Sequence, residues 1–368
     1  MLSEQDDNIG HQLPTTFNHV VSSDDRWTER YWYSGAPIDS GDVLLDMGLG
    51  WYPNKNVMDM FAGITVDNVQ YSYRVSRTLG STPLETAAGP LRYEIVEGLK
   101  HHRITLGQND SGLSFEIDWL ASFAGLEEHQ SFRRKRNRVE EDLIRMTQFG
   151  RMQGWIQLGD RRIEVTPDTW YAQRDHSWGI RSVMQTDMMS NDSLPAYKDF
   201  FWFWLTYQFE DYAMSLFLKE REPGHPFFLS GVEVDTAGEE REITAIEHDI
   251  EWADDPLGQT WSGGTLLLKY ADGGTRELTL HPQPARFFLK GGGYGGHRGW
   301  NHGDNKGRLH SDHYVWDLSD PEIRRQARQL GDHFTKVTCD GRTGYGMSEY
   351  GVARGYPKYE IAQKHEPL

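Results

Sequence analysis

Hydrophobic and polar residues alternate along several stretches of the chain. Val69-Gln70-Tyr71-Ser72-Tyr73-Arg74-Val75 has apolar side chains at every second position, and Leu113-Ser114-Phe115-Glu116-Ile117-Asp118-Trp119 repeats this pattern. A period of two indicates a β-strand with one face in a core and the other in solvent. Both stretches are therefore predicted to be half-buried antiparallel strands.

Similar stretches recur along the chain, whereas helix signals are few. Further strands are expected at 57–66, 91–97, 102–107, 144–157, 162–166, 169–182, 200–209, 212–219, 231–235, 242–252, 265–270 and 275–281. Asp272-Gly273-Gly274 predicts a hairpin turn between two of them. One helix is expected to begin at Pro321, with Asp320 as its N-cap and Gly331 past its end. The pattern predicts an all-β chain with few short helices, built as barrels or sandwiches.

The chain is long enough for two domains. Its 368 residues exceed a typical single domain. A short polar segment ending in a proline, Ser190 to Pro195, separates two sets of strands of similar number. We expect a polar N-terminal arm at 1–20, a first β-barrel at 21–192 and a second at 193–368.

Charge and cysteine content limit the partners and the compartment. The net charge of -17 argues against binding to nucleic acid, whose phosphates require a basic surface. The single cysteine, Cys339, excludes a disulfide within the chain and fits a reducing compartment. No secretory signal is visible in the acidic stretch Met1 to Gly10, and no apolar run is long enough to span a bilayer. We expect a cytoplasmic protein, with a homodimer as one option.

The most informative stretch for function is Arg174 to Arg181, which holds Asp175, His176 and Trp178. Carboxyl and imidazole groups beside aromatic rings suit proton transfer on an apolar substrate, because the rings exclude water and shift pKa values. In a regular strand His176 and Trp178 share one face, and Asp175 takes the other unless a bulge turns it. A barrel core with one satisfied polar pair explains the same residues.

An aromatic stretch at 200–209 offers a second set of candidates. Trp202 and Trp204 are expected on one face, and Tyr207 on the other. Core packing explains them most simply, and contact with a hydrophobic ligand is the alternative. Near the end of the chain Glu349 is a further candidate acid, for which a solvent-exposed position on an edge strand is the simpler interpretation.

A glycine-rich stretch from Gly291 to Gly303 is expected to form a loop over a barrel mouth, where Trp300 and His302 line a pocket. Four histidines gather in and after it: His297, His302, His310 and His313. Their spacing matches no zinc motif, so no metal site is assigned, and a metal enzyme is kept only as an alternative.

Together these residues resemble the two-domain lipocalin-like superfamily, which includes the carotenoid 1,2-hydratases and related natural-product cyclases. The resemblance rests on His176-x-Trp178, the aromatic strand after it, Trp300-x-His302-Gly303 and Gly344-Tyr345-Gly346-x-x-Glu349. It implies two lipocalin-like barrels in tandem, an apolar pocket at or beside their junction, and no cofactor. A second pair of the hydratases, Tyr-x-Asp, has no counterpart at Phe203-Trp204-Leu205.

The resulting hypothesis is an acid/base enzyme, a hydratase/dehydratase or an isomerase, for a hydrophobic isoprenoid- or steroid-like molecule. Asp175 or His176 would transfer the proton, and Tyr207 would orient water or substrate. Trp178, Trp202 and Trp204 would contact the substrate and stabilise positive charge. The alternatives are a non-catalytic carrier of small hydrophobic molecules and a cyclase that folds a polyene.

Overall fold

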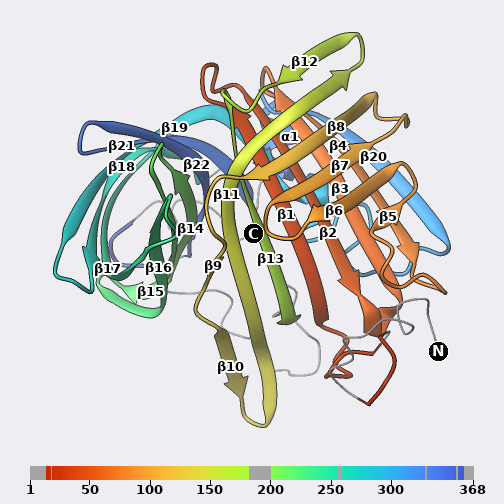
Figure 1. The fold of residues 1–368 in the computed structure, drawn as a ribbon, viewed down its shortest axis with the longest axis horizontal. Coiled ribbons are helices and arrows are strands. Elements are labelled where there is room, and N and C mark those ends of the chain that lie inside the picture. Colours follow the sequence, from red (N-terminus) through yellow and green to blue (C-terminus); the bar gives the residue numbers. More distant parts are fainter. Residues whose placement is uncertain are drawn as a thin grey trace.

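The computed structural model describes residues 14–17, 19–181, 200–254, 259–327, 330–353 and 355–359. The described residues form two β-sheets and a single α-helix, α1 (Pro321–Ala327) (Figure 1). The prediction of an all-β fold with two lipocalin-like barrels is confirmed. Within the same residues, no helix has the length and apolar character needed to cross a membrane.

The first sheet curls into a nearly closed barrel. Its strands are β1 (Trp27–Pro37), β2 (Val43–Tyr52), β3 (Val57–Val66), β4 (Val69–Thr78), β5 (Ala87–Ala88), β6 (Leu91–Glu97), β7 (His101–Leu106), β8 (Leu113–Ala121), β9 (Leu126–Glu127), β10 (Ser131–Lys135), β11 (Arg138–Leu158), β12 (Arg161–Val165), β13 (Trp170–Ile180) and β20 (Leu309–Asp317). The main path runs β20-β4-β3-β2-β1-β13-β11-β8-β7-β6-β5. The sheet bends until β5 contacts β3 and β4.

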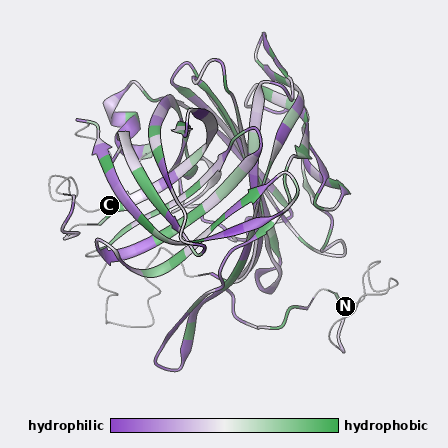
Figure 2. Cartoon of the chain, turned by 60° about the vertical axis from the view of Figure 1, so that its left-hand side comes forward, coloured by the Kyte–Doolittle hydropathy of each residue, from purple (hydrophilic) through white to green (hydrophobic). Residues whose placement is uncertain are grey.

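The second sheet is a closed barrel, because its first strand pairs with its last. Its strands are β14 (Phe201–Gln208), β15 (Tyr212–Glu222), β16 (His225–Asp235), β17 (Glu240–Trp252), β18 (Trp261–Tyr270), β19 (Thr275–Phe288), β21 (Gly331–Cys339) and β22 (Arg342–Val352). Apolar and polar residues alternate along these strands, as the coloured ribbon shows (Figure 2). The apolar face fills the barrel with a core that includes Phe203, Leu216 and Leu266.

One strand from the second half of the chain joins the first sheet. After β19 the chain forms the short 3-10 turn η3 (Leu289–Gly292), and a loop then leads to β20, which pairs with β4. Along this path Gly292 lies against Phe61, and Gly293 lies against Arg74. Residues 289–317 thus belong spatially to the first barrel, although they follow six strands of the second.

The outer face of the first sheet is covered by the second barrel and this loop. On β4 the expected core residues Tyr73 and Val75 are buried, but Gln70 and Arg74 on the opposite face are also 0% exposed. The prediction of a half-buried strand is therefore wrong for β4. The polar residues are hidden because η3 packs on them: Gln70 Nε2 donates a hydrogen bond of 2.9 Å to the Phe288 carbonyl.

Two local predictions are confirmed. Helix α1 begins at Pro321, and the Asp320 carboxylate accepts a hydrogen bond of 2.8 Å from the Glu322 backbone amide, as an N-cap does. The turn at Asp272-Gly273-Gly274 joins β18 to β19, with the Tyr270 amide donating to the Gly274 carbonyl at 2.9 Å.

Close approach of the strands in the second barrel requires glycine at 346. A Cβ atom at this position would lie 1.6 Å from the Thr206 carbonyl oxygen, which belongs to the backbone of a neighbouring strand. We expect Gly346→Ala to lower the free energy of unfolding by about 3 kcal/mol, at the upper end of overpacking costs. Chemical denaturation measures this. Gly98→Ala is the control, because no atom lies within 4 Å of the added Cβ. Equal stability of both variants would contradict the proposed constraint.

Candidate functional site

The main candidate site lies where the outer face of β1, β11 and β13 meets the second barrel. Asp175 on β13 is level with Trp32 on β1 and Thr147 on β11. Because neighbouring residues of a strand point to opposite faces, Asp175 shares the outer face with Trp32, and His176 points into the first barrel. The structure therefore places these two adjacent candidates at different sites.

Asp175 is held by an ion pair beside an aromatic ring. Arg145 Nε lies 3.1 Å from Asp175 Oδ2, and the Arg145 guanidinium is 5.3 Å from the centre of the Trp204 ring. Arg145 also lies 3.4 Å from Glu128, which accepts a 2.7 Å hydrogen bond from Trp204 Nε1. The side chains of Arg145 and Asp175 remain 14% and 12% exposed, so the pair is largely enclosed but still accessible.

Three carboxyl groups form a row across the junction of the barrels. Trp32 Nε1 donates to both Asp46 and Asp332, each at 3.1 Å. The carboxyls of Asp46 and Glu349 both influence the pKa of Asp332. Burial is the main cause that raises the pKa of Asp46, Asp332 and Glu349 well above their ordinary values. These carboxyls therefore keep their protons to higher pH than ordinary Asp and Glu side chains do.

Glu349 is the member of this row that a ligand can reach. Asp46 and Asp332 are 0% exposed, whereas Glu349 is only partly buried. The expectation that Glu349 lies on an edge strand is wrong, because β22 pairs with β14 on one side and with β21 on the other. The charge of Asp175 is near enough to contribute to the raised pKa of Glu349, after burial and the effect of Asp332.

The loop after η3 supplies Tyr294 and His302 to the same region. Arg30 Nη2 donates a 3.1 Å hydrogen bond to His302 Nε2, and the Arg30 guanidinium lies 4.5 Å from the centre of the Tyr294 ring. Burial, followed by the charge of Arg30, lowers the pKa of His302 well below its ordinary value. His302 is therefore neutral, with Nε2 as the acceptor and the proton on Nδ1.

Trp300 anchors that loop instead of lining an open surface. It is 2% exposed, and its ring lies 3.9 Å from the Arg74 guanidinium, which also donates a 2.8 Å hydrogen bond to the Trp300 carbonyl. Arg74 is paired with Asp59 at 3.4 Å. Burial raises the pKa of Asp59 to about 6, against the effect of Arg74.

The residues of β14 divide as expected between the two faces. Trp202 and Trp204 pack with the junction cluster that includes Trp32, whereas Tyr207 belongs to the core of the second barrel. The Tyr207 hydroxyl is hydrogen-bonded to Ser348 Oγ at 2.7 Å, and burial raises its pKa. Tyr207 is thus brought together with neither Asp175 nor His176.

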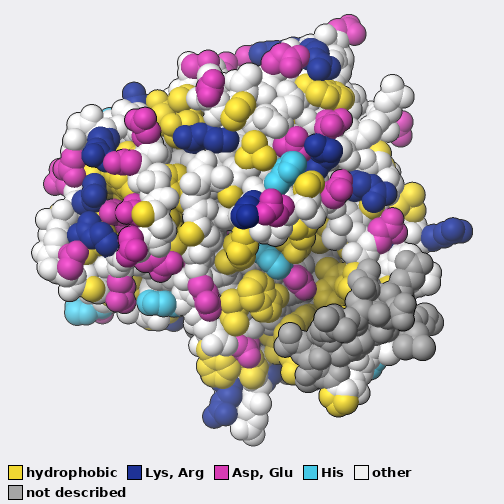
Figure 3. Space-filling model, in the orientation of Figure 1, with side chains coloured by type: hydrophobic (Ala, Val, Ile, Leu, Met, Phe, Trp, Pro, Cys, Tyr) yellow, Lys and Arg dark blue, Asp and Glu magenta, His cyan; other side chains and the backbone are white. Residues whose placement is uncertain are grey.

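His176 and Trp178 form a separate group inside the first barrel. His176 Nε2 is 2.8 Å from Glu29 Oε1, and its ring stacks on Tyr31 at 4.0 Å and lies 5.0 Å from the Trp178 ring. Hydrophobic side chains gather on the molecular face over the ends of β1 and β13 (Figure 3). This group is a second surface where an apolar molecule could bind.

Of the loop histidines, His297 packs against Tyr314 at 4.5 Å, and His310 packs against Trp300 at 4.8 Å. In the described residues no three His, Cys, Asp or Glu side chains are grouped to hold a metal ion. The metal alternative thus has no set of ligands there.

Sequence reasoning missed most of the polar groups at the junction. Arg30, Asp46, Arg145 and Asp332 occupy strand positions that alternate with apolar residues, where solvent exposure is the usual outcome. The one available signal was that polar residues such as Arg30 and Asp46 stand in otherwise very aromatic or apolar strands.

Comparison with solved structures gives the same fold. A candidate AttH protein from Nitrosomonas europaea is 14% identical, with a TM-score of 0.56 over 90% of this chain and 93% of that one. CghA, solved with Sch210972, is 8% identical, with a TM-score of 0.45 over 90% of this chain and 89% of its own. At such identity the first match shows the fold alone, and the second is too weak to carry an argument.

No curated protein matches the sequence. The model of one family does, and it covers residues 2–356, nearly the whole chain. The chain therefore belongs to this family, which is described as a family of unknown function, DUF8625.

Proposed function

We propose that the protein is a cofactor-independent acid/base enzyme, a hydratase/dehydratase or an isomerase, for a hydrophobic isoprenoid- or steroid-like molecule. One observation carries the proposal: Glu349, which is partly exposed and whose pKa is raised by burial, lies near Asp175, which is ion-paired with Arg145. Two carboxyl groups in different environments can divide the roles of acid and base.

In this mechanism Glu349 is the acid and Asp175 is the base. For hydration, the Glu349 proton goes to one alkene carbon, the water oxygen bonds to the other, and the water proton goes to Asp175. Dehydration reverses these steps. For isomerisation, Glu349 protonates one carbon while Asp175 removes a proton from another. Exchange with solvent then restores both carboxyl groups.

The surrounding residues support each role. Arg145 holds the Asp175 carboxylate, and the row of carboxyls keeps the proton on Glu349. The rings of Trp202 and Trp204 offer an apolar surface on the same face of β14. General acid/base assistance of this kind is worth about 10²- to 10⁴-fold in rate.

The non-catalytic carrier is the second candidate. It is favoured by the Trp32 bridge between Asp46 and Asp332, which gives the carboxyl row a structural purpose without any reaction. The cyclase alternative requires a shaped apolar surface and no proton transfer. It therefore predicts that no deuterium enters the product in the labelling experiment below.

Proton transfer can be measured before the natural substrate is known. The purified protein is incubated in D₂O with unsaturated and hydroxylated isoprenoids and steroids, and the recovered molecules are analysed by mass spectrometry for deuterium bound to carbon. We expect incorporation with the wild type. Glu349→Gln and Asp175→Asn should each reduce it by about 10²-fold or more, because each removes one partner of the transfer.

His176→Asn is the matched control, because His176 is adjacent to Asp175 but faces the first barrel. It should retain incorporation within a few-fold of the wild type. Loss of activity in His176→Asn alone would move the reaction to the first barrel. Bound molecules that are always recovered unlabelled would favour the carrier or the cyclase.

The protonation of Glu349 can be tested without any substrate. A carboxyl whose pKa is higher in the folded chain than in the unfolded chain stabilises the fold at low pH, and this contribution is lost as the pH rises towards the folded pKa. Burial raises the pKa of Glu349. Between pH 5 and pH 8 the wild type should therefore lose stability relative to Glu349→Gln, by up to about 1.4 kcal/mol per pH unit.

Urea denaturation at several pH values gives this difference. Glu240→Gln is the control, because Glu240 is exposed at the start of β17. The unfolding free energy of Glu240→Gln should change with pH as that of the wild type does. If the unfolding free energy of Glu349→Gln also follows the wild type at every pH, Glu349 is ionised in the folded protein and cannot serve as the acid.

A further inference from the structure

Arg30 and Arg181 are enclosed cations without a carboxylate partner. Among the described residues, neither guanidinium comes within ion-pair distance of an Asp or Glu side chain. Arg30 is 8% exposed and donates to His302; Arg181 Nη2 donates to Ser177 Oγ at 2.8 Å. The Nε of Arg181 is buried and has no hydrogen-bond partner. An unpaired charge in such a place lowers stability and calls for a reason.

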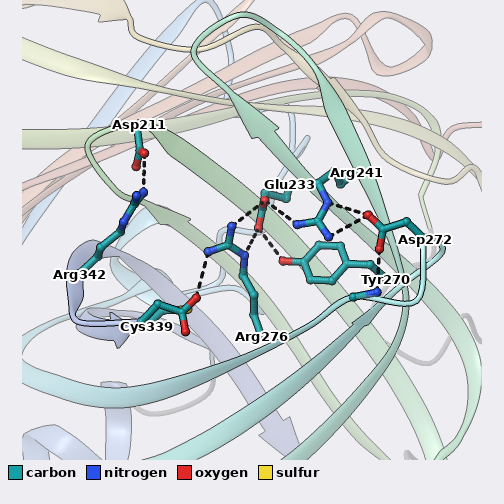
Figure 4. Close-up of polar contacts among 10 residues, drawn as sticks. Asp211, Glu233, Arg241, Tyr270, Asp272, Arg276, Cys339 and Arg342 are labelled. Carbon is teal, nitrogen blue, oxygen red and sulfur yellow. Dashed lines mark hydrogen bonds and ion pairs between the residues drawn. The ribbon is translucent and has the colours of Figure 1, made fainter.

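Elsewhere in the protein, several arginines are paired with carboxylates. At one end of the second barrel Arg276 lies 3.1 Å from Glu233, and Arg241 lies 2.8 Å from Asp272 (Figure 4). Arg342 forms a separate pair with Asp211 nearby. Other arginines without a carboxylate partner, such as Arg174 and Arg286, donate to amide, hydroxyl or carbonyl oxygens instead. Arg30 and Arg181 belong to this second group, and they lie beside the proposed acid and base.

The neighbouring acids compensate for the two charges only in part. The charge of Asp175 acts on both Arg30 and Arg181, but its carboxylate is ion-paired with Arg145, and burial raises the pKa of Glu349. Burial, followed by the charges of Arg30 and Arg145, lowers the pKa of Arg181 to about 10, so it stays charged at neutral pH. The region around Glu349 thus has a surplus of positive charge.

Tyr294 lies beside Arg30, within the electrostatic influence of Arg181, and offers a further donor. Arg30 covers its ring at 4.5 Å. Arg30 and Arg181 both oppose the rise in the pKa of its hydroxyl, which burial causes. Tyr294 is partly exposed, and no group in the described part of the chain is hydrogen-bonded to its hydroxyl. Arg181 Nε and the Tyr294 hydroxyl thus lack a partner in the described part of the chain, and the charges of Arg30, Arg181 and Glu349 all act on Tyr294.

We propose that this site binds an oxyanion, a carboxylate or enolate oxygen on an otherwise hydrophobic molecule, through Arg30, Arg181 and Tyr294. The inference rests on the proposed function and narrows its substrate class. Guanidinium groups bind carboxylates through two parallel hydrogen bonds, which gives both affinity and orientation. The hydrophobic body then lies against the tryptophans of the junction.

The same donors would favour one course of the reaction. In an α,β-unsaturated carbonyl substrate, water adds to the β-carbon, and the electron pair of the double bond moves to the carbonyl oxygen to give an enolate. Arg30 and Arg181 stabilise that negative oxygen, and the Glu349 proton then goes to the carbon next to the carbonyl. Water supplies the oxygen and gives its remaining proton to Asp175, so no redox partner is needed.

Matched acid and ester ligands test the inference. Binding of cis-parinaric acid and of lithocholic acid, each beside its methyl ester, is measured by isothermal titration calorimetry. We expect at least one acid to bind the wild type about tenfold more tightly than its ester, the effect of a charge-assisted hydrogen bond. Arg30→Met and Arg181→Met should each remove this preference and leave the affinity for the ester nearly unchanged.

Two controls separate recognition from folding. Arg92→Met removes an exposed arginine of β6 and should preserve the preference for the acid. Without ligand, Arg181→Met should melt at the same temperature as the wild type or higher, because it removes an unpaired buried charge. Arg30→Lys keeps a charge and should retain part of the preference. Equal binding of acid and ester by the wild type, or an intact preference in both methionine variants, would overturn the inference.

The outcome is distinguishable from failure of the proposed function. If acid and ester bind the wild type equally, but deuterium still enters neutral substrates in a way that depends on Glu349, the anion site is wrong and the acid/base mechanism stands. If the acids bind in an arginine-dependent way but never gain deuterium, the anion site is right and the protein is a carrier.

Discussion

The structure depends on where the polar side chains on the buried outer face of the first sheet find their hydrogen-bond partners. Buried polar groups need hydrogen-bond partners, and here many partners come from the other barrel. Trp32 on β1 donates to Asp332 on β21, and Gln208 on β14 donates to the carbonyls of Gly150 and Ala172. Separation of the barrels would break these hydrogen bonds and expose the aromatic residues that pack between them, such as Trp32 and Trp204. The two barrels are therefore joined by buried hydrogen bonds as well as by the chain.

This constraint also creates the chemistry of the junction. Trp32 bridges two buried carboxyls, and the same burial raises the pKa of Asp46, Asp332 and Glu349. The same enclosure makes the unpaired charge of Arg181 costly. The raised pKa of the carboxyls and the cost of the charge on Arg181 thus have one physical cause, which is the low polarity of the interface between the barrels.

Much of the fold could be predicted from the sequence, because strand period, turn and cap are local properties. The helix after Asp320 and the turn at Gly273 follow from a few adjacent residues. Strand β20 was missed because its first five residues are mostly polar and Leu309 and Val315 are exposed, so that only Tyr314 and Trp316 mark a buried face. Its pairing with β4 depends on residues far away in the chain, which no local pattern contains.

The candidate site could be predicted only in part, for the same reason. Alternation correctly separates Asp175 from His176, but it cannot say which face of β13 is covered by another barrel. Asp46 and Asp332 meet only through that packing, and each alone looks like an ordinary surface carboxylate. The resemblance to carotenoid hydratases directed attention to His176 and Trp178, which lie inside the first barrel with Tyr31.

The electrostatics of the junction bear on the kind of intermediate that it can stabilise. A tryptophan face attracts cations, and on this ground Trp204 was expected to stabilise a developing carbocation. The structure has already placed the Arg145 guanidinium 5.3 Å from that ring, with Arg30 and Arg181 close by. A further positive charge would be repelled at this position, whereas a negative oxygen would be attracted by three guanidinium groups at once. If the junction is catalytic, its charges therefore favour an enolate-like path over the carbocation path that the resemblance alone would imply.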